Sequence, residues 1–317
     1  MNALVVPTIR ENCMKEFLKK WQLTGLWDVI IIVEDNPKCT FSTKADFHYC
    51  WEDIDKDLGH QSMIISRRDS GIKCYGFFKA WEMGATHTFC LDDDCLPIDA
   101  FKFRNQHIAN LETTKRWAET VPGLRTRGIP YHNQGILPNV VFSVGLWTGV
   151  PDFDAIQQLS QGIPENFSPP NITRVMPHGQ FFPFCGMNFA FRSEVTPLCY
   201  FPLMGPSSGV PPYGRFDDIW FGLIAKKICD HLDYHIVCGE PFVYHTKASN
   251  VFNNLIKEGP GIALNETLWQ TIDEIKLKEH LPRTCMKEIG ESLATKEHAY
   301  ISLLGKAIQE WAGLFGG

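Results

Sequence analysis

The segment that most constrains the fold is a short apolar run that ends in three consecutive aspartates. Residues 86–91 read as a buried β-strand, and Asp92, Asp93 and Asp94 follow it at once. Adjacent carboxylates repel one another unless a cation lies among them, and hard divalent cations prefer oxygen ligands. Because open α/β sheets bind ligands at the carboxyl ends of their strands, the run predicts a metal site there. A solvated acidic turn is the alternative.

The first third of the chain alternates between expected strands and helices. Short β-branched runs predict buried strands, and apolar residues at helical spacing predict helices. The expected strands cover 3–6, 29–33, 62–66 and 86–91, and the expected helices cover 13–21 and 72–83. This alternation predicts an α/β fold with a mostly parallel central sheet covered by helices.

The rest of the chain departs from this regular alternation. Strands are expected at 140–145, 180–184, 187–191, 234–238 and 242–245, an irregular loop at 157–173, and a helix at 217–231. From residue 265 onward the pattern is that of amphipathic helices. We therefore expect a catalytic domain over 1–264 and a C-terminal helical tail over 265–317.

Composition narrows the class of protein. The 317 residues carry a net charge of −6, which argues against the basic face that nucleic acids require. No apolar run approaches the roughly 20 residues that span a bilayer. The first ten residues lead into a strand and do not resemble a secretory signal. The 11 cysteines form no Cys-x-x-Cys pair, so we expect reduced thiols and a cytoplasmic location.

Candidates for nucleotide binding follow the expected strands. Thr8 and Arg10 come after the first strand, and Asp35 closes the second. An acid there can bind a ribose hydroxyl or a base edge, and an arginine can pair with phosphate. A basic segment from Arg67 to Lys73 precedes a helix, whose N-terminus favours phosphate. Surface turns and helix capping are the alternatives at these positions.

Two later segments could also carry chemistry. Asp217 and Asp218 open an expected helix, where acids favour the N-terminus but could also hold a sugar hydroxyl or move a proton. His245 ends an expected strand and is a candidate third metal ligand, and the nearby Lys247 is a candidate partner for a diphosphate. A purely structural histidine is the alternative.

Taken together, these segments resemble the reversibly glycosylated polypeptides, the UDP-arabinopyranose mutase family. The resemblance runs from Val6 to at least Asn254. The motifs that carry it are Asp92-Asp93-Asp94-Cys95, Gln106-His107-Ile108, Arg127-Gly128-x-Pro130, Gly145-Leu146-Trp147, Pro151-Asp152-Phe153-Asp154, Phe184-Cys185-Gly186-Met187-Asn188, Leu203-Met204-Gly205, Gly214-Arg215-Phe216-Asp217-Asp218-Ile219-Trp220, Ile228-Cys229-Asp230-His231 and His245-x-Lys247-Ala248-Ser249-Asn250.

The resemblance implies a GT-A-like nucleotide-binding fold with an Asp-x-Asp metal site. It implies that the aspartates hold Mn²⁺ or Mg²⁺ against the diphosphate of a UDP-sugar, and that UDP-L-arabinopyranose and UDP-L-arabinofuranose are interconverted. Family members also glycosylate themselves on an arginine, which matches Arg127, and assemble into homo-oligomers or complexes with homologues. The candidate metal ligands are then Asp92, Asp94 and His245, the catalytic candidates are Arg127, Asp217 and Asp218, and the nucleotide-binding candidates are Thr8, Arg10, Asp35, Arg67, Lys73, Asp93 and Lys247.

One segment departs from the family pattern. Plant members carry a second arginine seven residues after the first, whereas residues 131–135 of this chain contain none. Two other functions therefore stay open from the sequence. One is a UDP-sugar-dependent glycosyltransferase with an external acceptor, and the other is a non-catalytic UDP-sugar-binding partner of an active homologue.

Overall fold

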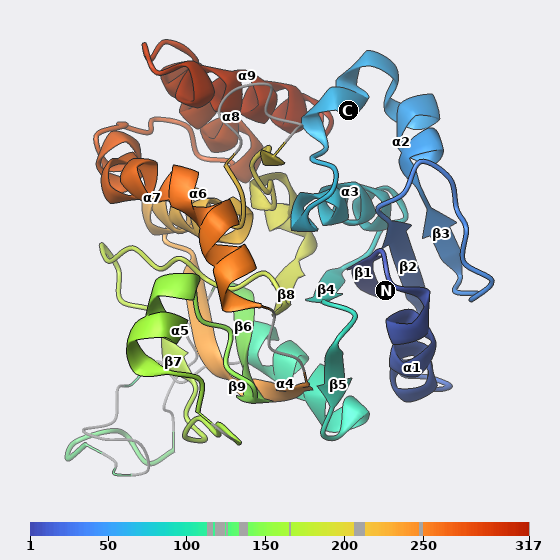
Figure 1. Cartoon of the computed structure of the whole chain (residues 1–317). Coiled ribbons are helices and arrows are strands. Elements are labelled where there is room, and N and C mark those ends of the chain that lie inside the picture. Colours follow the sequence, from blue (N-terminus) through green and yellow to red (C-terminus); the bar gives the residue numbers. More distant parts are fainter. Residues whose placement is uncertain are drawn as a thin grey trace.

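A single mixed sheet organises the part of the chain that the structure describes. This computed structural model describes residues 1–112, 117, 124, 126–132, 139–164, 166–205, 213–246 and 250–316. Its strands are β1 (Asn2–Thr8), β2 (Val29–Glu34), β3 (Phe47–Tyr49), β4 (His87–Leu91), β5 (Cys95–Pro97), β6 (Val140–Gly149), β7 (Arg174–Val175), β8 (Asn188–Arg192) and β9 (His235–His245). Their order is β3-β2-β1-β4-β8-β6-β9-β5, and β7 pairs with β9 (Figure 1).

Most of these strands point the same way. Parallel pairing joins β3, β2, β1 and β4, and β6 and β9 share their direction, whereas β5, β7 and β8 run against them. The expected α/β class with a mostly parallel sheet is therefore confirmed. Because β4, β6 and β9 share a direction, their carboxyl ends lie toward the same edge of the sheet.

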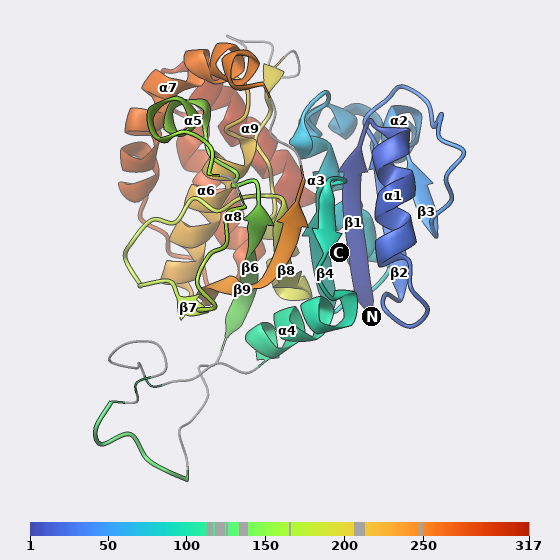
Figure 2. The same cartoon turned by 60° about the horizontal axis from the view of Figure 1, so that its bottom comes forward.

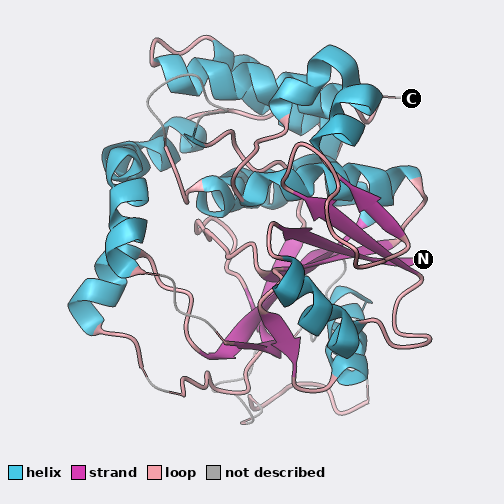
Figure 3. Cartoon of the chain, turned by 45° about the vertical axis from the view of Figure 1, so that its right-hand side comes forward, coloured by secondary structure: helices cyan, strands magenta, loops and turns pink. Residues whose placement is uncertain are grey.

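Helices cover both faces of the sheet (Figure 3). They are α1 (Glu11–Trp21), α2 (Trp51–Leu58), α3 (Lys73–Glu82), α4 (Ala100–Glu112), α5 (Ala155–Gln161), α6 (Asp217–His231), α7 (Val251–Asp273), α8 (Pro282–Ala294) and α9 (Ala299–Gly313), with short 3-10 helices η1 (Gly59–Ile64), η2 (Ser70–Ile72) and η3 (Ser193–Leu198). Leu4 packs in one core with α1 and α4, whereas its neighbour Val5 packs in the other with α3, α6 and the C-terminal helices. Alternation of this kind is what a strand buried on both faces requires.

The position of α3 is fixed by close contact with the sheet. A Cβ atom at Gly76 would lie 2.5 Å from Val5 Cγ1 and 2.9 Å from Val33 Cγ2. Only a glycine lets the helix approach β1 and β2 this closely. The first residue of α3, Lys73, is thereby held fully buried at the edge of the sheet where β4 ends.

Several expected elements were correct, and others were not. The helix at 217–231 matches α6, and β1, β2, β4, β6 and β8 cover expected strands. The strand expected at 62–66 was wrong, because this segment lies largely in η1, and β3 takes the place beside β2. The strand expected at 180–184 was also wrong, because Phe184 packs against other aromatic rings and forms no ladder.

Three further expectations need adjustment. The segment expected to be an irregular loop at 157–173 contains most of α5, which Asp154 caps by accepting a hydrogen bond from the Gln157 amide. The two strands expected at 234–238 and 242–245 are one continuous strand, β9. The C-terminal helices begin earlier than residue 265, since α7 starts at Val251.

The C-terminal helices pack beside α6 (Figure 1). The indole Nε1 of Trp311 in α9 donates to Pro197 O over 2.9 Å, and Trp220 Nε1 in α6 donates to Asn265 Oδ1 in α7 over 2.9 Å. The expected boundary near Leu264 falls inside α7. A division into domains at 1–264 and 265–317 stays a prediction.

None of the eleven cysteines, all of which lie in the described residues, forms a disulfide in this structure. Across the described ranges, the helices lack the combination of length and apolar character that a bilayer crossing needs.

Candidate functional site

The aspartate triplet lies in the short connection between β4 and β5. β5 pairs antiparallel with the end of β9, and Cys95 lies opposite His245. This pairing brings two parts of the chain that are distant in sequence to the same place. As a result, His245 Nε2 lies 3.9 Å from Asp94 Oδ1.

The surroundings of His245 determine which ring nitrogen can act as a ligand. Its Nδ1 lies 2.8 Å from the Val150 carbonyl oxygen, which can only accept a hydrogen bond. Nδ1 therefore carries the hydrogen, and Nε2 presents a lone pair toward Asp94 in the neutral ring. A separation of 3.9 Å is too long for a hydrogen bond, but two ligands each about 2.1 Å from one ion lie within about 4.2 Å of each other. This pair fits a shared divalent cation.

Asp92 does not complete this pair as a compact set of three. It does not join Asp94 and His245 in a group whose ligand atoms all lie within 4.8 Å of one another. Its Oδ1 instead accepts from Lys73 Nζ over 3.0 Å. The three expected metal ligands are therefore neighbours, but only Asp94 and His245 face each other directly.

Lys73 is the buried counter-ion of Asp92. Its ammonium group also donates to Gly186 O over 2.9 Å and lies 5.1 Å from the Phe201 ring centroid. Burial raises the pKa of Asp92, and the Lys73 charge opposes that rise. Burial by itself would lower the pKa of Lys73, but the Asp92 carboxylate outweighs it and the pKa is raised, so Lys73 remains charged.

Asp93 is held by the last residue of β1 and by a residue that follows this strand. The buried Asp93 carboxylate accepts from the Thr8 hydroxyl over 2.5 Å and from Arg10 Nε over 3.2 Å. The guanidinium Nη2 of Arg10 contacts Asp93 and also donates to Asp94 Oδ2 over 2.8 Å. Parallel pairing of β1 with β4 places these residues side by side. Three of the expected nucleotide-binding residues, Thr8, Arg10 and Asp93, therefore form one unit beside the metal pair.

A second group of carboxylates lies at the start of α6. The Gly186 amide donates to Asp218 Oδ2 over 3.0 Å, and the Ser70 hydroxyl donates to Asp217. Burial, followed by the neighbouring charges of Asp217 and Asp152, raises the pKa of Asp218 to about 7. A carboxyl group that titrates near neutrality can donate or accept a proton at working pH.

Gly186 joins the two groups of carboxylates. Its amide donates to Asp218, and its carbonyl oxygen accepts from Lys73, which in turn pairs with Asp92. A Cβ atom at this position would lie 2.8 Å from Phe201 Cε1 and 3.1 Å from Asp218 Cβ. The glycine thus allows the backbone to pass between the two acids.

The residues Asp35 and Arg67 lie around Trp51. Asp35 is buried and accepts from Trp51 Nε1 over 2.7 Å, and burial raises the pKa of its carboxyl. The Arg67 guanidinium carbon lies 5.2 Å from the Trp51 ring centroid, and its Nη2 pairs with Asp55. These contacts place both residues near the carboxyl end of β2. The Asp35 amide also donates to Thr8 O over 2.9 Å, so this group adjoins the residue that holds Asp93.

The remaining expected residues are not brought to this place by the described structure. Arg127 is exposed within segment 126–132, which lies apart from the sheet, on the side where β6 begins (Figure 2). The aspartates follow the carboxyl end of β4, and β4 runs in the same direction as β6. Segment 126–132 therefore lies at the opposite edge of the sheet from the aspartates. Lys247 lies outside the described residues.

Two residues that contact the second group of carboxylates were missed as site candidates. The Cys185 thiol donates to Asp152 Oδ2 over 2.8 Å, and the ligand atoms of Asp152, Cys185 and Asp218 all lie within 4.8 Å of one another. Both lie in motifs that the resemblance already singled out, at 151–154 and 184–188. The motifs could have nominated them, but only the fold shows that they meet Asp218.

Comparison with known proteins gives matches over nearly the whole chain. A model of the family described as reversibly glycosylated polypeptide matches residues 2–316. UDP-arabinopyranose mutase 1 of Arabidopsis thaliana is 32% identical over 337 residues, which cover 97% of this chain and 90% of the relative. Probable UDP-arabinopyranose mutase 1 of Pisum sativum is 33% identical over 331 residues, which cover 98% and 84%.

A solved structure also aligns with much of the chain. It is glucosyl-3-phosphoglycerate synthase from Mycobacterium tuberculosis in complex with Mn²⁺, UDP and phosphoglyceric acid. Its sequence identity is 11% and its TM-score is 0.48, and the alignment covers 85% of this chain and 78% of that chain.

Proposed function

Because the chain belongs to the reversibly glycosylated polypeptide family, we propose that it interconverts UDP-L-arabinopyranose and UDP-L-arabinofuranose. The observation that carries this proposal is the match to named mutases along almost the full length of both chains. The enzyme is then an intramolecular transferase that moves no sugar to an external acceptor.

We assign the divalent ion of this reaction to Asp94 and His245, with Asp92 beside them. The lone pair of His245 Nε2 faces Asp94 Oδ1 across 3.9 Å, and the carboxylate ligands suit Mn²⁺ or Mg²⁺. When bound, the ion supplies charge that neutralises the diphosphate of the leaving UDP. Arg10, whose side chain is 36% exposed, can add a second positive group on the same side.

Ring contraction requires a proton to leave one sugar hydroxyl and another to reach the former ring oxygen. The bond from C1 to UDP breaks, a different hydroxyl of the sugar bonds to C1, the bond from C1 to the former ring oxygen breaks, and UDP re-adds to C1. In this scheme Asp218 takes the proton from the attacking hydroxyl and returns it to the former ring oxygen, so no net proton is consumed. Asp217 is held by Ser70 and fixes the sugar beside it.

The pH dependence of the reaction tests the role of Asp218. Its folded pKa of about 7 lies above the ordinary 3.8, so the carboxyl keeps its proton until the pH approaches neutrality. A base must be ionised, so turnover should rise as the pH increases through about 7 and then level. In Asp218→Asn this inflection should vanish and turnover should fall about tenfold to a hundredfold, measured as kcat against pH. If Asp218→Asn keeps the inflection of kcat near pH 7, a group other than Asp218 is responsible for the pH dependence.

Self-glycosylation and assembly complete the proposal. Arg127 is the arginine that matches the family's acceptor, and it is exposed. We propose that it carries a transferred sugar and that the chain associates with itself or with homologues. Intact mass after incubation with UDP-arabinose reports the adduct, and peptide mapping locates it.

Incubation of the purified chain with UDP-arabinopyranose and MnCl₂, followed by chromatography of sugar nucleotides, tests the main activity. The expected result is a UDP-arabinofuranose peak without any added acceptor. UDP release only in the presence of an acceptor would instead make the chain a glycosyltransferase. Binding of UDP without turnover, together with restored activity of a homologue, would make it a non-catalytic partner.

A further inference from the structure

A second set of metal-binding side chains lies beyond the carboxyl end of β2, outside the site described above. Two overlapping groups share Cys39, and within each group all ligand atoms lie within 4.8 Å of one another. The groups are Glu34, Cys39 and His48, and Cys39, Cys50 and Asp53. They contain two thiols and an imidazole, which is not the oxygen-rich chemistry of the aspartate triplet.

The fully buried Glu34 holds the loop that carries Cys39. Its carboxylate accepts from the Thr40 amide over 3.0 Å, from the Thr40 hydroxyl over 2.5 Å and from Asn36 Nδ2 over 2.8 Å. These bonds fix the backbone on both sides of Cys39. The thiol is thereby placed in advance over the start of α2, and it is the only exposed cysteine among the residues that the structure describes.

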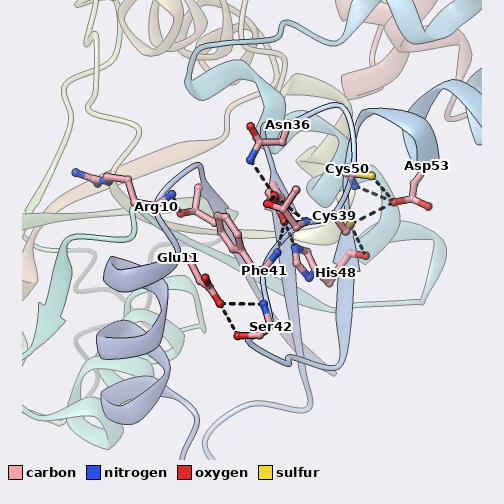
Figure 4. Close-up of polar contacts among 12 residues, drawn as sticks. Arg10, Glu11, Asn36, Cys39, Phe41, Ser42, His48, Cys50 and Asp53 are labelled. Atoms are coloured by element: carbon pink, nitrogen blue, oxygen red, sulfur yellow. Dashed lines mark hydrogen bonds and ion pairs between the residues drawn. The ribbon is translucent and has the colours of Figure 1, made fainter.

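Cys50 and Asp53 are fixed by the first turn of α2. Cys50 is the N-cap residue, and its amide donates to Asp53 Oδ2 over 2.8 Å. The same oxygen lies 3.2 Å from Cys50 Sγ and 3.7 Å from Cys39 Sγ (Figure 4). Zinc binds sulfur at about 2.3 Å and oxygen at about 2.1 Å, so a tetrahedral site separates these atoms by about 3.6 Å. The three side chains already approach this geometry.

His48 supplies a nitrogen beside the same thiol. Its Nε2 is buried and makes no hydrogen bond within the described part of the chain. It lies 2.8 Å from Glu34 Oε2, but at an angle that does not form a hydrogen bond. A buried nitrogen without a hydrogen bond is costly, and coordination to a metal would satisfy it.

From this geometry we propose that Cys39, Cys50 and Asp53 bind one Zn²⁺ ion per chain, with Glu34 holding the loop. His48 is grouped with Cys39 but not with Cys50 and Asp53, and we propose that its imidazole moves in as the fourth ligand. Metal binding displaces the two thiol protons to solvent, so no oxidant or reductant is needed. The bound ion would cross-link the loop after β2 to the first turn of α2, next to Asp35 and Trp51.

Cobalt substitution tests this site in the full chain. Reduced, metal-free protein is titrated with Co²⁺, and the expected result is a thiolate-to-cobalt charge-transfer band that saturates at one equivalent and disappears when Zn²⁺ is added. Cys39→Ser should lose the band. Cys13→Ser, which removes a partly exposed cysteine of α1, should keep it.

The same measurement separates this site from the aspartate triplet. Asp94→Asn should leave the band unchanged, because the triplet and His245 contribute no sulfur. Circular dichroism confirms that each variant is folded, which is expected for Cys39→Ser because the side chain is exposed. The proposal is overturned if the reduced wild type gives no thiolate band, or if the band survives in Cys39→Ser. The proposal is also overturned if Cys39 and Cys50 form a disulfide and the protein binds no cobalt after that disulfide is reduced.

Discussion

Replacing Asp94 by asparagine should lower metal-dependent turnover of UDP-arabinopyranose on the order of 10³-fold. The variant keeps nearly the same shape but loses the charge that faces His245 Nε2 across 3.9 Å. Without that charge the ion is held weakly, and the leaving diphosphate loses its main counter-charge. The measurement is kcat/KM at several MnCl₂ concentrations, together with Mn²⁺ binding followed by electron paramagnetic resonance. Higher MnCl₂ should restore part of the activity.

Asp233→Asn is the matched control for this substitution. Asp233 is exposed and has a φ of 55°, a conformation that asparagine tolerates well. Asp233 lies just before the amino end of β9, whereas His245 ends this strand. The substitution therefore removes the same charge as Asp94→Asn, but far from His245. Its turnover and Mn²⁺ binding should match the wild type. If Asp94→Asn also keeps wild-type metal binding, the assignment of the ion to this pair is wrong.

The second large effect is on stability and comes from Lys73→Met. Methionine fills a similar volume but leaves Asp92 without its counter-ion and Gly186 O without its donor. Lys73 is fully buried, but the Asp92 side chain is 33% exposed, so water stabilises part of the charge that remains. The expected cost is therefore about 2 kcal/mol, below that of a fully buried pair and roughly a thirtyfold change in the folding equilibrium. Urea unfolding should show a lower midpoint with an unchanged slope.

Two further variants make this prediction specific. Lys79→Met removes a lysine of the same helix whose pairs with Asp57 and Glu82 lie at the surface, so its cost should stay below about 1 kcal/mol. The double variant Lys73→Met/Asp92→Asn should be more stable than Lys73→Met alone, because the uncompensated charge is gone. A loss equal to that of Lys79→Met would show that Lys73 is not the counter-ion of Asp92.

Local patterns were enough to predict the parts of the fold that depend on near neighbours. The β-branched run of β2 and the acids that begin α6 are strong local signals, and both elements lie where expected. The apolar residues of 62–66 gave an equally strand-like pattern. They form no strand because β3 already pairs with β2 at that edge, and pairing is decided by the whole sheet.

The candidate site shows the same division between local and distant information. The triplet and His245 could be nominated from their positions at strand ends, but their approach depends on the pairing of β5 with β9. Lys73 was expected to bind the nucleotide because the basic segment from Arg67 to Lys73 precedes a helix. Its ammonium instead contacts Asp92 and Gly186 O, because the close packing of Gly76 brings the start of α3 under the end of β4. The spacing of residues in the sequence does not predict that Lys73 lies beside Asp92.

The pairing of β5 with β9 also has a consequence for synthesis of the protein. A nascent chain displays its acidic triplet long before the ribosome has released His245, because the imidazole belongs to a much later strand. On the proposed assignment of the ion to Asp94 and His245, both ligands are present together only after that late strand docks, since contacts between distant segments form only after the intervening chain has closed. An incomplete polypeptide that lacks β9 would therefore lack half of the proposed metal pair.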